Sequence, residues 1–440
     1  MSNTVALISL GCAKNLVNSE QMMYLLDKAG FSLTGDVSEA DAVVINTCGF
    51  IDSAVSEAID SILETASRKL NGYPKIIVAG CLAERFRKSI REEMPEVDAV
   101  IGTGGYGEVA DVVAAALGGE TPEVYPDINA PTEECGRIVS TPPWTAYIKI
   151  AEGCDNCCSY CVIPSLRGRF RSRRFEDIVA EAEELVKSGA RELIVVAQDI
   201  TRYGTDNYGR RRLGELIRSL CAIPELHWLR LHYLYPDELD DGLIDVIASE
   251  DKVVKYLDIP IQHCNDKILR AMNRRGKKAE LLKLFKKLRE RIPGVVLRTS
   301  LISGLPGEGE QEFLELCEFL REVRLERVGV FPFSPQEGTP AADMPGAADA
   351  ETVAKRISLI NDLQSSIMDE YNESRLGQNL EVLCEGLDPE TGLYFGRSFA
   401  DSPEIDGRVL FSARNAIPGS FVIVKINGAE DGDLTGEALY

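Results

Sequence analysis

The sequence predicts an α/β protein built from three domains. Short β-branched runs alternate with amphipathic helical stretches over residues 4–118 and again over 144–335, and from about residue 379 short strands are separated by turns. A chain of 440 residues exceeds what one hydrophobic core usually serves, and its 45% hydrophobic content is ample for several. We therefore divide it into an N-terminal domain (1–118), a linker (119–143), a central domain (144–372) and a C-terminal domain (373–440).

The N-terminal domain is predicted to contain a parallel sheet. Three runs are clear, VALISLG, DAVVINT and KIIVAG, and each is followed directly by a cysteine, giving Cys12, Cys48 and Cys81. Because right-handed crossovers place the carboxyl ends of parallel strands along one edge, where ligands bind, these thiols should converge in space. A cysteine at a strand end can also simply fill the core, but three repetitions of the same placement favour ligands.

The central domain repeats the alternation over six units. Its candidate strands are TAYIKIA, ELIVVAQD, WLRLHYLY, YLDIPIQ, VVLRTSLISG and RVGVFPF, and a long helical stretch over 352–377 follows them. Six units are two short of a complete eight-unit barrel, so a partial (β/α)6 barrel and a doubly wound sheet both fit. In either fold, functional residues should line the carboxyl ends of the strands.

Two further segments differ in composition from these domains. Residues 119–143 are rich in proline and turn-forming residues and predict a linker. Five short runs near the C-terminus, NLEVLCEG, LYFGRS, GRVLF, SFVIVKIN and TGEALY, predict a small all-β barrel. From residue 373 onward there are twelve Asp or Glu and five Lys or Arg, so this barrel should be acidic.

Charge and composition exclude several classes of function. The net charge is −22, the opposite sign to that of most proteins that bind duplex nucleic acid. The sequence begins without a basic and then apolar leader, and no apolar run is long enough to cross a bilayer, so we expect a cytoplasmic protein without a membrane partner. Reducing conditions there disfavour disulfides among the twelve cysteines, and only three histidines occur, so sulfur is the favoured metal ligand.

Four cysteines occupy eight positions in the stretch AEGCDNCCSYCVIPSLRGRFRSR. Two Cys-x-x-Cys pairs, Cys154 with Cys157 and Cys158 with Cys161, would suggest zinc, but no loop separates them to let two turns face one metal. Read instead as Cys-x-x-x-Cys-x-x-Cys, the stretch supplies three thiolates to an iron-sulfur cube and leaves one iron open for a substrate. Cys157 is then spare, and the arginine-rich run over 167–174 is expected to be solvated.

Directly after the first strand of a partial barrel, this spacing resembles the signature of radical S-adenosylmethionine (SAM) enzymes. The whole layout is similar to that of the methylthiotransferases in this group, with local matches in SLGCAKNLVNSE, NTCGFI, VAGCLAER, GCDNCCSYCVIPSLRGRFRSR, AQDITRYG, DIPIQH and ISGLPGE. The resemblance implies a partial (β/α)6 radical SAM barrel, a TRAM-like terminal β-barrel, SAM as cofactor and two 4Fe-4S clusters. It places one cluster on Cys154, Cys158 and Cys161 and the other on Cys12, Cys48 and Cys81.

Within that family the chain resembles the branch that modifies a small-subunit ribosomal protein. The stretches NTCGFIDSAVSEAIDSI, IPIQHCND and DSPEIDGRVLF carry this likeness. It implies transfer of a methylthio group to the β-carbon of an aspartate in ribosomal protein twelve, and methylthiolation of a tRNA adenosine is the alternative. An acidic C-terminal barrel suits a basic ribosomal protein better than an RNA backbone, so nucleic acid is not expected as the primary substrate. The implied chemistry also needs a reducing electron donor.

Four polar residues in or at the ends of predicted barrel strands are candidates for SAM binding. Gln198 and Asp199 end the second strand of the barrel and Gln262 ends the fourth, where they can reach methionyl or ribose groups. Arg298, in the fifth strand, can pair with the carboxylate of SAM. Ordinary hydrogen bonding within the barrel mouth accounts for the same four residues equally well. The sequence identifies no general acid or base, which agrees with its low histidine content.

Overall fold

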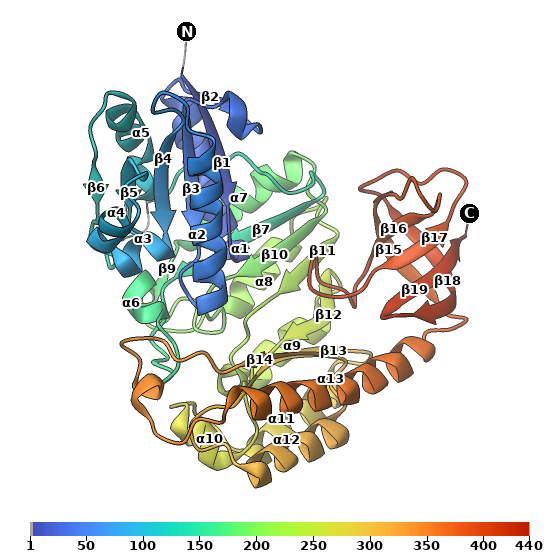
Figure 1. The fold of residues 1–440 in the computed structure, drawn as a ribbon. Helices are drawn as coiled ribbons and strands as arrows, with labels where there is room; N and C mark the ends of the chain where they lie inside the picture. The colour runs from blue at the N-terminus through green and yellow to red at the C-terminus, as the bar shows by residue number, and fades with distance from the viewer. Residues whose placement is uncertain (1–2, 132, 440) are drawn as a thin grey trace.

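The computed structural model describes residues 3–131 and 133–439 (Figure 1). Its N-terminal sheet is parallel throughout and has the strand order β2-β1-β3-β4-β5-β6. The strands are β1 (Thr4–Ser9), β2 (Ser32–Thr34), β3 (Ala42–Thr47), β4 (Lys75–Gly80), β5 (Ala99–Ile101) and β6 (Glu123–Val124). The helices are α1 (Ala13–Lys28), η1 (Val37–Glu39), α2 (Asp52–Ser67), α3 (Cys81–Phe86), α4 (Lys88–Glu93), η2 (Tyr106–Glu108) and α5 (Val109–Leu117).

Helices cover both faces of this sheet, which explains the continuous apolar runs of its middle strands. Every residue of β3 is buried, as expected for a parallel strand between two helical layers. On one face α1 and α5 contribute Met22 and Val112 to the core, and on the other α2 and α4 contribute Ile62 and Ile90. The sheet also extends past the boundary predicted at residue 118, because β6 lies within the segment expected to be a linker.

The central sheet is open, parallel and in consecutive order, β7-β10-β11-β12-β13-β14 (Figure 1). The strand order of a doubly wound sheet reverses at a switch point, whereas this order runs consecutively from one edge to the other. Of the two predicted folds, the structure therefore has the partial barrel. The strands are β7 (Thr145–Lys149), β10 (Glu192–Val196), β11 (Trp228–Leu231), β12 (Val253–Asp258), β13 (Val296–Ser303) and β14 (Arg327–Pro332). The longer helices are α7 (Phe175–Lys187), α8 (Leu213–Cys221), α9 (Asp241–Ser249), α11 (Lys278–Arg291), α12 (Glu310–Val323) and α13 (Ala350–Glu373).

Several short elements complete the rim of the central domain. They are β8 (Ala151–Glu152), α6 (Ile163–Arg167), β9 (Arg171–Ser172), η3 (Pro236–Glu238), α10 (Asp266–Ala271) and η4 (Pro340–Asp343). β8 pairs with β9 in an antiparallel ribbon directly after the first barrel strand. The cysteine-rich loop and α6 lie between these two strands, so both are fixed at the carboxyl edge of the sheet.

The C-terminal domain is a closed five-stranded barrel, as predicted. Its strand order is β15-β16-β17-β19-β18, and α13 leads into it (Figure 1). The strands are β15 (Asn379–Leu387), β16 (Tyr394–Ser398), β17 (Val409–Ser412), β18 (Phe421–Glu430) and β19 (Asp433–Ala438), and the predicted last residue, Tyr440, lies outside the described residues. Across the part of the chain that the structure describes, no helix is both long and apolar enough to cross a bilayer.

A buried ion cluster joins this barrel to the central domain. Glu192, at the start of β10, accepts hydrogen bonds from Arg230 Nε at 2.8 Å and from Arg397 Nη2 at 2.7 Å. Arg397 lies in β16 of the C-terminal barrel, and the Arg397 and Glu192 side chains are only 4% and 0% exposed. An apolar cluster that contains Trp228 and Leu383 packs across the same joint. The C-terminal barrel is therefore docked on the central domain through a buried ion cluster and an apolar cluster beside it.

Candidate active site

The three N-terminal cysteines lie at the crevice of the first sheet. β1 and β3 are neighbours, whereas the chain leaves them toward opposite edges, so their carboxyl ends frame a topological switch point. Cys12 caps α1, Cys48 follows β3 directly and Cys81 begins α3. A Cβ added to Gly11 would lie 2.7 Å from Cys48 Cβ, and one added to Gly49 would lie 2.9 Å from the Cys81 carbonyl. The loops that carry the three thiols therefore pack directly against one another.

These thiols are also close enough to influence each other electrostatically. Burial, followed by the charge of Cys81, raises the pKa of Cys48 to about 11. Burial likewise raises the pKa of Cys81. For Cys12 burial acts in the same direction, but Lys14 and Arg167 outweigh it and lower the pKa. Three mutually close sulfurs facing two cations, with Cys81 buried and Cys12 open to solvent, suit a group that takes thiolates and carries its own iron, so a 4Fe-4S cluster fits this trio.

The second trio lies on the loop between β8 and α6, at the carboxyl end of the first barrel strand. Cys154 N donates to Gly168 O at 3.1 Å, and Cys161 N donates to Cys158 O at 3.0 Å. Gly153 has a φ of +77°, and a Cβ there would lie 2.1 Å from the carbonyl oxygen of Arg169. Only glycine fits that position, so the backbone itself holds the cysteine loop against the segment that follows α6.

Two thiols of this second trio, those of Cys154 and Cys161, have raised pKa values. Burial is the main cause that raises the pKa of Cys154 to about 11 and that of Cys161 to about 12. Arg274 Nη1 lies 3.8 Å from Cys158 Sγ and places a cation beside the thiols. Cys157 is exposed and adopts a left-handed φ of 50°, which distinguishes it from the other three, all of which are partly buried.

The arrangement of the sulfurs does not match a single-ion site. Among the described residues, no three His, Cys, Asp or Glu side chains are placed to hold one metal ion. Tetrahedral zinc draws all its ligands to within about 2.3 Å of one ion, whereas a cube distributes its thiolates over separate irons. The pairing of Cys154 with Cys157 and of Cys158 with Cys161 around zinc is therefore disfavoured.

Two of the predicted SAM contacts lie beside the barrel trio. Asp199 accepts hydrogen bonds from Asn156 Nδ2 at 2.8 Å and from Thr201 N at 3.0 Å, so it is tied to the cysteine loop itself. Gln198 Nε2 donates to Glu152 Oε1 at 2.8 Å. Its Oε1 is buried and, in the structure, has no hydrogen-bond partner. A buried acceptor without a donor is costly, and the amino group of a bound SAM would satisfy it.

The other two predicted contacts are placed differently. Arg298 Nη1 donates to Asp258 Oδ1 at 2.7 Å, and the two residues are register partners on β13 and β12. This guanidinium is therefore already paired with a protein carboxylate. Gln262 has a φ of 69° and forms an isolated bridge with Leu301. The structure thus brings Gln198 and Asp199 to the cysteine loop, while Gln262 follows β12 and Arg298 lies within β13, further along the sheet.

Sequence reasoning missed the charged residues between the two trios. Arg167 and Glu152 are both buried, although the run that contains Arg167 was expected to be solvated. Lys149 Nζ donates to Glu152 Oε2 at 2.8 Å, and Lys14 Nζ lies 3.5 Å from the centroid of the Tyr233 ring. Their closeness to the cysteines in the sequence could have identified two of them, because Lys14 and Glu152 each lie two residues from a predicted cluster ligand.

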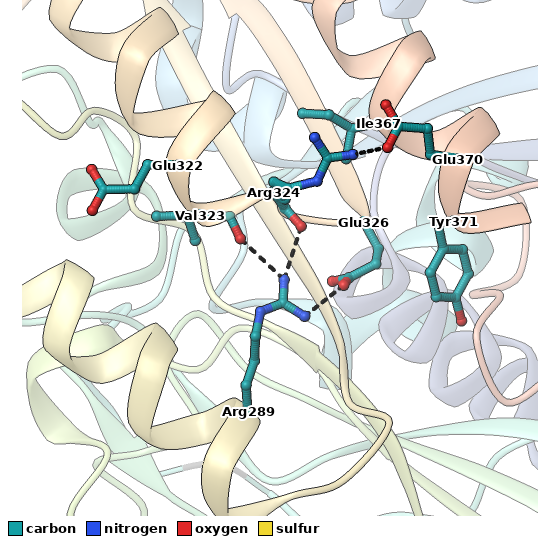
Figure 2. A pocket seen from close by; sticks show the side chains of 8 residues that line it. All are labelled: Arg289, Glu322, Val323, Arg324, Glu326, Ile367, Glu370 and Tyr371. Atoms are coloured by element: carbon teal, nitrogen blue, oxygen red, sulfur yellow. Dashed lines mark hydrogen bonds and ion pairs between the residues drawn. The ribbon is translucent and has the colours of Figure 1, made fainter. Parts of the chain in front are cut away.

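One large pocket lies far from this chemistry (Figure 2). It is lined by Arg289, Glu322, Val323, Arg324, Glu326, Ile367, Glu370 and Tyr371. Arg289 pairs there with Glu326 Oε1 at 2.7 Å and with the Arg324 carbonyl at 2.8 Å. Residues 324–326 precede β14, so the pocket is at the amino ends of the strands, the edge opposite to the cysteines. Because barrel active sites lie at the carboxyl ends, we do not assign it to the site.

Comparisons with known proteins match all three parts of the chain. Family models described as uncharacterized protein family UPF0004, radical SAM superfamily and TRAM domain match residues 4–102, 148–320 and 376–439. A ribosomal protein uS12 methylthiotransferase RimO from Pelotomaculum thermopropionicum is 48% identical over 100% of both chains. Proteins of the same name from Desulforamulus reducens and Geobacter sulfurreducens are 47% and 46% identical and cover 99% and 100% of both chains.

Solved structures are similar at much lower identity. The radical SAM methyltransferase TsrM from Kitasatospora setae gives a TM-score of 0.59 at 15% identity, covering 78% of this chain and 75% of its own. The cobalamin-dependent SAM radical enzyme OxsB gives 0.51 at 12% identity, covering 83% of this chain and 56% of its own. At these identities the likeness shows the fold alone, and it agrees with the partial barrel described above.

Proposed function

Because this chain belongs to the ribosomal protein uS12 methylthiotransferase family, we propose that it adds a methylthio group to the β-carbon of an aspartate in that ribosomal protein. The observation that carries the proposal is the presence of two cysteine trios at the carboxyl edges of two adjoining sheets. One trio alone would suffice for SAM cleavage. A second trio beside it supports a reaction that also has to deliver sulfur.

We assign one 4Fe-4S cluster to each trio. When bound, the barrel cluster supplies the electron that cleaves SAM, and the N-terminal cluster supplies the place where the sulfur to be transferred is held. Cys154, Cys158 and Cys161 would hold the first, and Cys12, Cys48 and Cys81 the second.

Residues of the barrel mouth would orient SAM beside its cluster. The free Oε1 of Gln198 accepts from the SAM amino group, and Glu152 fixes the Gln198 amide in the orientation that this requires. Asp199 braces the cysteine loop through Asn156. The barrel wall below them is apolar and buried, which keeps water from the reacting atoms.

The C-terminal barrel is the part that we assign to substrate recognition. From residue 373 onward there are twelve acidic and five basic residues, so the electrostatic field of this barrel favours a basic protein and repels an RNA backbone. Ribosomal proteins carry the positive charge that such a surface attracts. A reducing partner must also dock to supply electrons.

The decisive experiment compares the two substrate classes directly. Enzyme reconstituted anaerobically with iron and sulfide is incubated with SAM, a reductant and either purified uS12 or unmodified tRNA, and both are examined by mass spectrometry. We expect a methylthio mass gain on a single aspartate of uS12 and none on tRNA. The matched Cys158→Ala variant should modify neither. Modification of tRNA, or of neither substrate by the wild type, would contradict the proposal. Iron analysis should give about eight irons per chain.

A further inference from the structure

A buried arginine connects the two trios. Arg167 ends α6, the helix that follows the barrel trio, and its side chain is 3% exposed. Its Nε donates to Cys81 Sγ at 3.3 Å, in the N-terminal domain. Its Nη2 and Nη1 donate to the side-chain oxygens of Asn15 and Asn18, each at 2.9 Å. Both asparagines lie on α1, which begins directly after Cys12. One guanidinium therefore touches the elements that carry two of the three N-terminal thiols.

The same guanidinium is also linked, through Glu152, to Gln198, one of the residues predicted to bind SAM. Arg167 Nη1 donates to Glu152 Oε2 at 3.2 Å, and Glu152 Oε1 accepts from Gln198 Nε2 at 2.8 Å. An unbroken chain of polar contacts thus runs from Cys81 Sγ to the amide of Gln198. Desolvating a guanidinium is costly unless its donors are satisfied, and four contacts from its three nitrogens satisfy most of this one. The arrangement is specific to arginine, because a lysine ammonium has no planar fork.

We propose that Arg167 is a positioning residue that docks the N-terminal trio on the barrel and raises the reduction potential of the cluster held there. The inference rests on the proposed function, since it takes Cys81 to be a cluster ligand. Hydrogen bonds to ligand sulfurs are among the factors that set the potential of an iron-sulfur cluster. An N–H donor and a fixed positive charge beside a ligand sulfur stabilise the reduced cluster, which carries one more negative charge. Because Arg167 and Cys81 are both buried, solvent screens this effect only weakly.

A purely structural tie between the domains makes a different prediction. Its loss would lower stability or domain contact and leave the potential of any bound cluster unchanged. The potential therefore separates the two roles, whereas loss of activity would not. The run that contains Arg167 also supplies a matched control, because Arg169 is exposed and its side chain reaches no thiol.

The test uses the full chain with all three barrel cysteines replaced by alanine, so that only the N-terminal trio can hold a cluster. This parent, and the same protein carrying Arg167→Met, Arg167→Lys or Arg169→Met, is reconstituted anaerobically with iron and sulfide. Iron content is measured, and the potential is obtained by redox titration followed by electron paramagnetic resonance. We expect the lowest potential for Arg167→Met, an intermediate value for Arg167→Lys and the parent's value for Arg169→Met.

Each other outcome has a distinct meaning. A parent that binds no iron refutes the proposed ligand set and not the role of Arg167 alone. If the parent binds iron and the Arg167 variants keep its potential, the inference is overturned while the proposed function stands. If Arg167→Met fails to hold iron, the reduction potential of the cluster is measured in Arg167→Lys instead. A potential equal to that of the parent protein in this variant overturns the inference.

Discussion

Replacing Glu192 by glutamine should loosen the joint between the central domain and the C-terminal barrel. Removing one partner of a buried ion pair costs about 3–5 kcal/mol, because the remaining charge stays desolvated. Here Arg397 keeps Glu385 Oε1 at 2.8 Å and Arg230 keeps the Phe399 carbonyl at 2.9 Å. We therefore expect Glu192→Gln to lower the free energy of unfolding by an amount at the lower end of this range, about 3 kcal/mol.

The pKa of Glu192 supplies an independent route to the same magnitude. Burial acts to raise this pKa, but Arg397 and Arg230 outweigh it and lower the pKa from its usual 4.5 to about 2. At about 1.4 kcal/mol for each pKa unit, this corresponds to about 3 kcal/mol. Since the folded-state pKa is depressed, the contribution is present above pH 4.5 and is lost as the pH falls toward 2. A glutamine variant should lack this part of the acid sensitivity.

The two tryptophans of the chain report on this joint. Trp228 packs edge-on against Phe421 at 4.7 Å between ring centroids, and Trp144 belongs to the same interfacial cluster. Urea titration followed by tryptophan fluorescence at pH 7 should show the loss in Glu192→Gln. In the control Glu225→Gln the lost partner is Arg191 and the glutamate is 67% exposed, so we expect a change below about 1 kcal/mol. Equal shifts in the two variants would refute the argument from buried charge.

Three further substitutions test the cysteine trios. Gly11→Ala should remove about half of the iron, since its Cβ would lie 2.7 Å from Cys48 Cβ. Gly30 has a similar φ but no atom within 4 Å of an added Cβ, so Gly30→Ala should keep its iron, and an equal loss of iron there would refute the steric reason. Cys154→Ala should lower the iron from about eight to about four per chain and abolish SAM cleavage, and retained cleavage would exclude its assigned role. Cys157→Ala should change neither iron nor cleavage, because the side chain is exposed, and a loss of metal would support the zinc-type pairing instead.

Much of the fold is predictable because long buried strands leave a local signal. β3 and β4 are continuous apolar runs that end at a cysteine, so both their positions and their shared edge follow from the sequence. β2, β5 and β6 are two or three residues long and are too short for any periodicity. The choice between a partial barrel and a doubly wound sheet depends on strand order, which is set by tertiary packing and not by any one segment.

The charged residues of the site show where sequence reasoning stops. Arg167 and Arg169 lie in one basic run, yet the first is buried and the second exposed, because α6 ends at Arg167 and the chain turns at Gly168 with a φ of 74°. The partners of Arg167 are distant in the sequence, with Cys81 86 residues away. Arg298 remains a predicted SAM contact, but sequence reasoning did not foresee that Asp258 on the adjacent strand pairs with its guanidinium.

The two cysteine trios cannot be positioned independently of each other. Arg167 belongs to the short segment that also carries Cys161, and a small apolar cluster of Cys81, Val162 and Leu166 seals the contact between the domains. Any shift of this segment therefore moves Cys161, a proposed cluster ligand, and the cation beside Cys81 together. Because protein interiors are closely packed, a small displacement of one buried side chain also displaces its neighbours. For this reason the contact between the domains, more than either sheet alone, sets the geometry in which a sulfur donor and a substrate radical can meet.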